Sequence, residues 1–198
     1  MKLALIAALS ATVSTSALAN DFDNTNFSVT AQSGVLAFTI DGDQTTGYTN
    51  MEIRSQVLTY SMGENIDSTL DLFVGHNRML DEMTAGAEYT MTYMPGSMAV
   101  YGSAQLEYSA ATNDLSNGNV FVTPTFGTSY RLDHNFTVFS EVSYTWDASN
   151  NWNTRGGTLE VGVNYAVTDA WTITPSLVRT FDTVNDETQL HIATRFVF

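Results

Sequence analysis

Most of this chain is a succession of short segments in which apolar and polar residues alternate with a period of two. In the final segment, one parity holds Leu190, Ile192, Thr194, Phe196 and Phe198, and the other holds Gln189, His191, Ala193 and Arg195. A period of two places the two sets on opposite faces of a β-strand. Each segment is about as long as the roughly 9–11 residues that a tilted strand needs to cross a bilayer. The pattern therefore predicts an all-β fold with long strands.

The alternation predicts ten strands joined by connections that are short and long in turn. The predicted strands are 27–40, 48–60, 69–79, 84–94, 98–110, 120–132, 136–146, 158–167, 171–182 and 188–198. Short turns such as Pro95-Gly96-Ser97 and Asp169-Ala170 alternate with longer loops such as 112–119 and 147–157. Short turns on one side and longer loops on the other are typical of a membrane barrel. An eight-strand count stays open, because strand boundaries read from one sequence carry errors of several residues.

The amino end has the composition of a secretion signal. Met1-Lys2 is basic, 3–9 is apolar, and Ala17-Leu18-Ala19 fits the pattern of small residues at a cleavage site. We therefore expect 1–19 to be a signal peptide and 20–198 to be a single barrel domain. Lys2 is the only Lys of the chain, so its removal takes the net charge from -14 to -15.

The carboxyl end carries a resemblance. A final alternating strand that ends on Phe198 resembles the assembly signal of small Gram-negative outer-membrane β-barrels of the OmpX-like and OmpA-type class. In that signal the outward residues would be Leu190, Ile192, Phe196 and Phe198. The resemblance implies a closed antiparallel up-and-down transmembrane β-barrel in the cell outer membrane. It also implies contact with membrane lipid and lipopolysaccharide, and with the barrel-assembly machinery and periplasmic chaperones during biogenesis. We expect a monomer.

Aromatic residues lie near the ends of the predicted strands. The residues expected to form interfacial girdles are Tyr130, Phe136, Tyr144, Trp146 and Trp171. Two aromatic bands about one membrane thickness apart anchor a barrel in the bilayer. Aromatics also favour strands in general, but their position at strand ends favours the girdle over a soluble β-sandwich.

A few positions break the pattern. Pro124 and Pro175 lie in mid-strand, where a proline removes a ladder hydrogen bond, so we expect bulges or weak pairing there. The first segment changes parity at Ser33-Gly34, which favours a β-bulge. Arg179 falls on the apolar face, and either a bulge turns it inward or it lies at the outer rim.

The inward parity collects most of the charge of the strands. The residues expected to form a charge network in the lumen are Glu52, Arg54, Asp71, Glu88, Glu107, Arg131, Glu141, Glu160, His191 and Arg195. We expect Arg54, Arg131 and Arg195 each to pair with an inward carboxylate, because unpaired charge inside a protein is costly. Arg155, in an outer loop, is expected to contribute little to stability.

Composition excludes several function classes. The chain has no Cys, which excludes disulfides and thiolate metal sites. Its acidity excludes nucleic-acid binding through phosphate neutralisation. Asp41-Gly42-Asp43 resembles only a fragment of a calcium loop, so no metal site and no cofactor are predicted.

Three functions remain compatible with the sequence. The first is a non-enzymatic barrel with a charged, closed or nearly closed lumen and a structural or surface-interaction role. The second is a narrow porin-like channel for water, ions or small solutes. The third is a lipid-modifying outer-membrane enzyme, for which His76 would be the residue to examine. We expect no enzymatic activity, because no Ser accompanies His76 in a recognisable motif.

Overall fold

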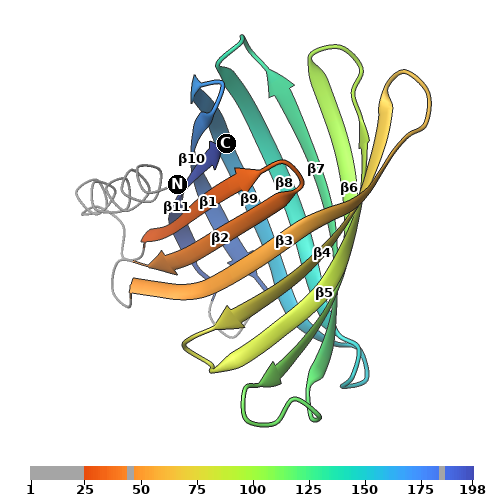
Figure 1. Ribbon diagram of the computed structural model, residues 1–198, viewed down its shortest axis with the longest axis vertical. Helices are drawn as coiled ribbons and strands as arrows, with labels where there is room; N and C mark the ends of the chain where they lie inside the picture. Colours follow the sequence, from red (N-terminus) through yellow and green to blue (C-terminus); the bar gives the residue numbers. More distant parts are fainter. Residues whose placement is uncertain (1–24, 44–46, 183–185) are drawn as a thin grey trace.

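A computed structural model describes residues 25–43, 47–182 and 186–198, and within them the chain forms a closed barrel of eleven strands (Figure 1). The strands are β1 (Thr25–Ser33), β2 (Leu36–Asp43), β3 (Gly47–Ser61), β4 (Ile66–Asn77), β5 (Glu82–Tyr93), β6 (Met98–Ala111), β7 (Asn119–Arg131), β8 (Phe136–Asp147), β9 (Asn153–Thr168), β10 (Trp171–Phe181) and β11 (Thr188–Val197). The expected signal peptide, 1–19, lies outside the described residues. No helix in the described ranges is long and apolar enough to cross a membrane.

Strands that are consecutive in the sequence are neighbours in the barrel and pair antiparallel, but the pair that closes it does not. β1 pairs with β11 in parallel, from Thr25 opposite Leu190 to Gln32 opposite Val197. The predictions of ten strands, of eight, and of a wholly antiparallel ladder are therefore wrong. An odd strand number forces a parallel closure, because the first and last strands then run in the same direction.

The extra strand comes from the first predicted segment, 27–40. The change of parity at Ser33-Gly34 marks a tight hairpin rather than a β-bulge, and Ser33 pairs directly with Leu36. Gly34 has φ +58°, a left-handed conformation that glycine adopts without steric strain. A bulge and a two-residue turn both change the parity, and only the reversal of the chain distinguishes them.

The connections lie at two rims. The turns after β1, β3, β5, β7 and β9 share one rim with Phe198, here called the C-terminal rim. In Figure 1 the turns after β3, β5, β7 and β9 lie at the top, and the β1–β2 turn and the C-terminus lie lower. The last residues of β2, β4, β6, β8 and β10 lie at the opposite end, here called the loop rim. From β5 onward the described connections are short and long in turn, as predicted: 94–97, 112–118, 132–135, 148–152 and 169–170. The connections 62–65 and 78–81 are as short as 94–97, so the predicted alternation fails between β3 and β5.

The two mid-strand prolines interrupt pairing on one side, as predicted. The β7–β8 register passes from Val122 to Thr125 without a partner for Pro124. The β9–β10 register likewise passes from Ile173 to Ser176 without a partner for Pro175. Each proline keeps a register partner on its other side, opposite Ala104 and Ile192 respectively. Proline lacks an N–H, so these gaps follow directly from its chemistry.

The apolar parity faces outward along the barrel wall. Ile53, Val74, Leu106, Phe126 and Val161 each expose about half of their surface. Only three hydrophobic residues of the described chain are buried, Val29, Phe73 and Ala110. The outer surface of the barrel is therefore largely apolar along its wall.

Aromatic rings gather near both rims. At the C-terminal rim, Phe136 stacks on Tyr165 with ring centroids 4.7 Å apart, and Trp171 stacks on Phe196 at 5.8 Å. At the loop rim, Tyr144 lies 4.7 Å from Trp146 and 6.0 Å from Phe181. Arg179 is half exposed at the same rim, and its guanidinium lies 3.9 Å from Asp186.

Candidate functional site: the lumen

The polar parity of the strands points into the barrel, where Arg54 forms the largest charge cluster. Its Nε lies 2.8 Å from Glu52 Oε1, and its Nη1 contacts Glu88 on β5 and lies 4.0 Å from Asp71 on β4. The guanidinium also sits over the ring of Phe73, 4.8 Å from the centroid. Three strands thus bring three carboxylates to one cation.

Strand register explains why the cation is needed. Asp71 and Glu88 are directly opposite on β4 and β5, where like charges destabilise a sheet. Arg54 offsets this repulsion, but one positive charge cannot neutralise three carboxylates. Asp71 Oδ1 is buried and has no hydrogen-bond partner in the described structure. The cluster therefore retains a net negative charge.

A second pair of opposed acids faces the lumen from the other side of the barrel. Glu141 on β8 is directly opposite Glu160 on β9. Tyr101 donates its hydroxyl to Glu141 at 2.7 Å, and His191 Nδ1 lies 3.9 Å from Glu160 Oε1. Glu107 accepts a hydrogen bond from Gln105 at 2.9 Å. Hydroxyl, amide and imidazole groups, and no arginine in the described structure, contact these three carboxylates.

The lumen charges remain accessible to water. The side chains of Arg54, Glu52, Asp71, Glu88, Glu160 and His191 are between 21% and 26% exposed. In a barrel filled by its own side chains these groups would be buried. Water in this space reduces the penalty of holding unpaired carboxylates, because their charge stays partly solvated.

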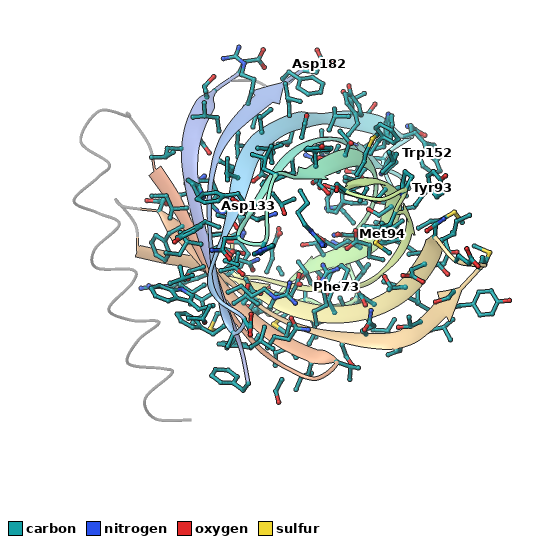
Figure 2. The ribbon with its side chains drawn as sticks, turned by 90° about the horizontal axis from the view of Figure 1, so that it is seen from above. Phe73, Tyr93, Met94, Asp133, Trp152 and Asp182 are labelled. Carbon is teal, nitrogen blue, oxygen red and sulfur yellow. The ribbon has the colours of Figure 1, made fainter. Side chains whose placement is uncertain are left out.

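Inward aromatics pack on glycines across the strand ladders. Phe73 is directly opposite Gly86, Tyr101 opposite Gly127, and Phe139 opposite Gly162. A Cβ added to any of these glycines would lie within 2.9 Å of the facing ring. The rings therefore pack against the backbone of the barrel wall at these glycines. Figure 2 looks into the barrel with its side chains drawn and Phe73 labelled. Cross-strand pairing of glycine with an aromatic is a known device for curving and closing sheets.

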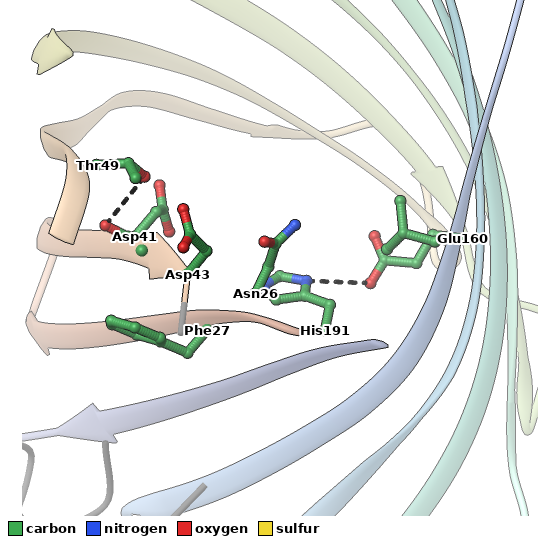
Figure 3. Close-up of a pocket in the computed structure, with 9 residues that line it drawn as sticks. Asn26, Phe27, Asp41, Asp43, Thr49, Glu160 and His191 are labelled. Atoms are coloured by element: carbon green, nitrogen blue, oxygen red, sulfur yellow. Dashed lines mark hydrogen bonds and ion pairs between the residues drawn. The ribbon is translucent and has the colours of Figure 1, made fainter. Parts of the chain in front are cut away.

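Near the loop rim the lumen widens into a cavity of about 370 Å³ (Figure 3). Its polar lining comes from Asn26, Asp41, Asp43, Thr49, Glu160 and His191. Figure 3 shows Asp41 and Asp43 on one side and the His191–Glu160 pair on the other, with Asn26 beside its register partner His191. No group of three His, Asp or Glu side chains in the described ranges is placed to hold a metal ion. The described lining of the cavity is acidic, and the cavity is here called the acidic vestibule.

Two predicted lumen arginines are not paired as expected. Arg195 donates to the amide oxygen of Gln32 and is exposed. Arg131 is exposed near the C-terminal rim, where it borders a small cavity with Ser97 and Thr137. The structure shows no ion pair for either among 25–43, 47–182 and 186–198. The expectation fails because both residues lie at strand ends, where water satisfies the guanidinium.

Arg155, which was expected to lie in an outer loop and contribute little, forms an ion pair. It lies in β9, and its Nη2 is 2.7 Å from Asp147 Oδ2 at the end of β8. Asp147 is completely buried and also accepts a hydrogen bond from Ser149 at 2.7 Å. Asp147 lies beyond the Tyr144–Trp146 aromatic pair. The hydrogen bonds from Ser149 and Arg155 hold the pKa of its carboxyl below the ordinary range.

His76 has one charged neighbour. Its Nε2 lies 3.6 Å from Asp81 Oδ1 near the loop rim. In the described part of the chain no hydrogen bond joins His76 to a serine hydroxyl that it could activate as a nucleophile.

The inward aromatics are the residues that sequence reasoning missed. Phe73, Tyr101 and Phe139 occupy the polar parity, where an aromatic looks like a break in the alternation. A signal was present, since each has a glycine on a neighbouring strand. Recognising it requires the register between strands, which one sequence does not supply.

The chain matches no protein-family model and no curated protein sequence.

Proposed function

We propose that this protein is an outer-membrane β-barrel whose hydrated, acidic lumen forms a narrow passage that prefers small cations. The support for a membrane location is the outward apolar wall, the aromatic pairs near both rims and the terminal strand that ends on Phe198. In this proposal membrane lipid and lipopolysaccharide surround the wall. The assembly machinery and periplasmic chaperones act during biogenesis.

The accessibility of the lumen charges carries the proposal. Carboxylates that keep about a fifth of their surface exposed inside a barrel border water, and they outnumber the arginine that pairs with them. A water-filled lumen lined by one sign of charge concentrates ions of the opposite sign. Glu141 and Glu160 are the strongest candidates for this effect, because no arginine pairs with either in the described structure.

Planar-bilayer recording with purified protein tests this function. We expect small unitary conductances and, in a KCl gradient, a reversal potential of the sign that cation preference gives. The double change Glu141→Gln and Glu160→Gln removes two lumen charges while keeping hydrogen-bonding groups, so it should shift the reversal potential toward zero. Glu64→Gln, in the exposed turn between β3 and β4, removes the same kind of charge from the rim and should leave it unchanged.

A closed barrel with a structural or surface-interaction role is the second candidate. It is favoured by the Arg54 cluster, in which Glu52, Asp71, Glu88 and Phe73 gather around one guanidinium. A folded, inserted protein that carries no current would support this role and overturn the channel. In either case we propose no catalytic activity, and an unchanged lipid A composition after overexpression is the expected result.

A further inference from the structure

β3 extends beyond its neighbour on one side. β2 pairs with β3 only as far as Leu36 opposite Ser55, and the last contact is the hydrogen bond from Gln56 N to Val35 O. β3 then continues to Ser61, paired with β4 alone. Figure 1 shows the β1–β2 turn ending well below the β3–β4 turn. The segment Gln56–Ser61, here called the β3 edge, therefore has an open side.

The hydrogen-bond pattern shows which groups the open side presents. Met62 N donates to Ile66 O at 2.7 Å, and antiparallel ladders alternate, so Tyr60 and Leu58 also direct their backbone groups to β4. Thr59 and Ser61 consequently point their N–H and C=O groups away from β4. No described strand lies on that side. Within the described residues β11 does not cover it, because β11 pairs with β1 as far as Gln32 opposite Val197 and its last backbone bond there runs from Phe198 N to Gln32 O.

The outward face of the β3 edge is apolar. Val57, Leu58 and Tyr60 are 50%, 55% and 60% exposed. Tyr60 lies one residue before the end of its strand, as Tyr130 does in β7, which places both in the aromatic band of the C-terminal rim. Val57 and Leu58 are farther from that rim. If the barrel lies in a membrane as proposed above, the open backbone groups of Thr59 and Ser61 lie level with the aromatic band, where lipid limits their access to water and favours pairing with another strand.

We propose that the β3 edge is a dimer interface, and that it pairs antiparallel with the β3 edge of a second copy of this chain. An antiparallel edge is self-complementary, so one two-fold axis satisfies both copies. Pairing Thr59 with Ser61 of the second copy uses all four open backbone groups on each side. In this register Tyr60 lies opposite Tyr60 of the second copy.

Charge also favours a second copy at this position. The chain has a net charge of -14, so most of its polar surfaces repel another copy. The β3 edge, Gln-Val-Leu-Thr-Tyr-Ser, carries no charged residue. This inference rests on the proposed membrane location and departs from the monomer expected from the sequence.

Disulfide trapping tests the interface cleanly, because the chain has no cysteine. Directly opposed residues of a non-hydrogen-bonded antiparallel pair have Cα atoms roughly 4.5 Å apart, inside the range of about 4.4–6.8 Å that a disulfide spans. We expect Tyr60→Cys, oxidised in isolated outer membranes, to migrate mainly as a dimer that reducing agent dissociates. Tyr130→Cys is the matched control. It removes an exposed tyrosine near the same rim from a strand that has a neighbour on both sides, and it should stay monomeric.

A second variant tests the backbone ladder itself. Thr59→Pro removes an N–H that points to the open side, so it should leave the β3–β4 ladder intact and abolish trapping in the Tyr60→Cys background. A fractionated outer membrane in which Tyr60→Cys stays monomeric would overturn the dimer and leave the location intact. Absence of the protein from that fraction would instead overturn the location. Equal trapping of both cysteine variants, or trapping to a protein of another mass, would also overturn the proposal.

Discussion

The Arg54 cluster in the lumen and the Asp147 cluster at the loop rim use the same chemical groups in opposite ways. In the lumen one guanidinium faces three carboxylates, and all of them are about a fifth to a quarter exposed. At the rim one fully buried carboxylate receives a half-exposed guanidinium and a serine hydroxyl. At the rim one positive and one negative charge are paired, and the carboxylate of Asp147 is shielded from water. The lumen cluster has more carboxylates than cations, and all of its charged side chains are partly exposed. This arrangement fits the proposed passage for cations better than a closed structural barrel.

The largest expected effect concerns the wall that supports the lumen cluster. A Cβ at Gly86 would lie 2.3 Å from Leu106 O and 2.5 Å from Phe73 Cζ. Gly86→Ala should therefore displace the ring beneath Arg54 and destabilise the barrel by roughly 3 kcal/mol in detergent-micelle unfolding by urea. Gly102→Ala, whose Cβ would meet only Thr125 O at 3.7 Å, should unfold like wild type. Equal midpoints for the two variants would refute a tightly packed wall.

Replacing Arg54, the cation of the lumen cluster, should have the second-largest effect on stability. Arg54→Met leaves Glu52, Asp71 and Glu88 close together without compensation. Loss of one partner of a fully buried pair costs about 3–5 kcal/mol, and partial hydration reduces this to about 2 kcal/mol here. Arg195→Met removes only a hydrogen bond to Gln32 at an exposed position and should have little effect. Similar unfolding of both variants would mean that water alone stabilises the lumen acids.

The rim cluster should give a smaller change. Arg155→Met leaves Asp147 buried but still bonded to Ser149, so the unfolding midpoint should fall by less than in Arg54→Met and by more than in Arg195→Met. Differential scanning calorimetry of the three variants gives the order. If Arg155→Met proves the most damaging, the rim rather than the lumen holds the barrel together.

The smallest effect is a dependence on pH confined to the rim. Because the pKa of Asp147 is lower in the folded protein than in the unfolded chain, its ionised form stabilises the fold above the ordinary aspartate pKa of about 4. That contribution disappears as the pH falls through the depressed folded pKa. Asp147→Asn should accordingly be less stable than wild type at pH 7, and the difference should close in acid. A difference independent of pH would assign the loss to packing instead of charge.

The sequence predicted the features that depend on parity alone. Alternation identified the strands, the inward acids and the outward apolar wall, and the prolines marked the interrupted ladders. Features that depend on register were missed. Arg131 and Arg195 have the inward parity of Arg54, but their height in the barrel leaves them at its ends. Arg155 was assigned to a loop, although the β8–β9 ladder continues to Asn153 opposite Asp147.

The strand count failed for a related reason. One strand with a bulge and two strands with a tight turn give the same parity change around Gly34. The choice between them depends on whether the chain reverses at Gly34. That reversal leaves β1 free to pair on its other side with β11, which is far away in the sequence. Local patterns cannot report it, because the closing partner, β11, is the last segment of the chain.

The parallel closure places the start of the first strand and the end of the last strand at opposite rims of the barrel. A barrel with an even number of strands returns to the rim where it began, so both of its ends emerge together. With eleven strands, the chain enters β1 at the loop rim and leaves β11 at the C-terminal rim. In a membrane, a reporter fused ahead of Thr25 and one fused after Phe198 would therefore face different compartments. The first and last strands of the described barrel would therefore open onto opposite sides of that bilayer.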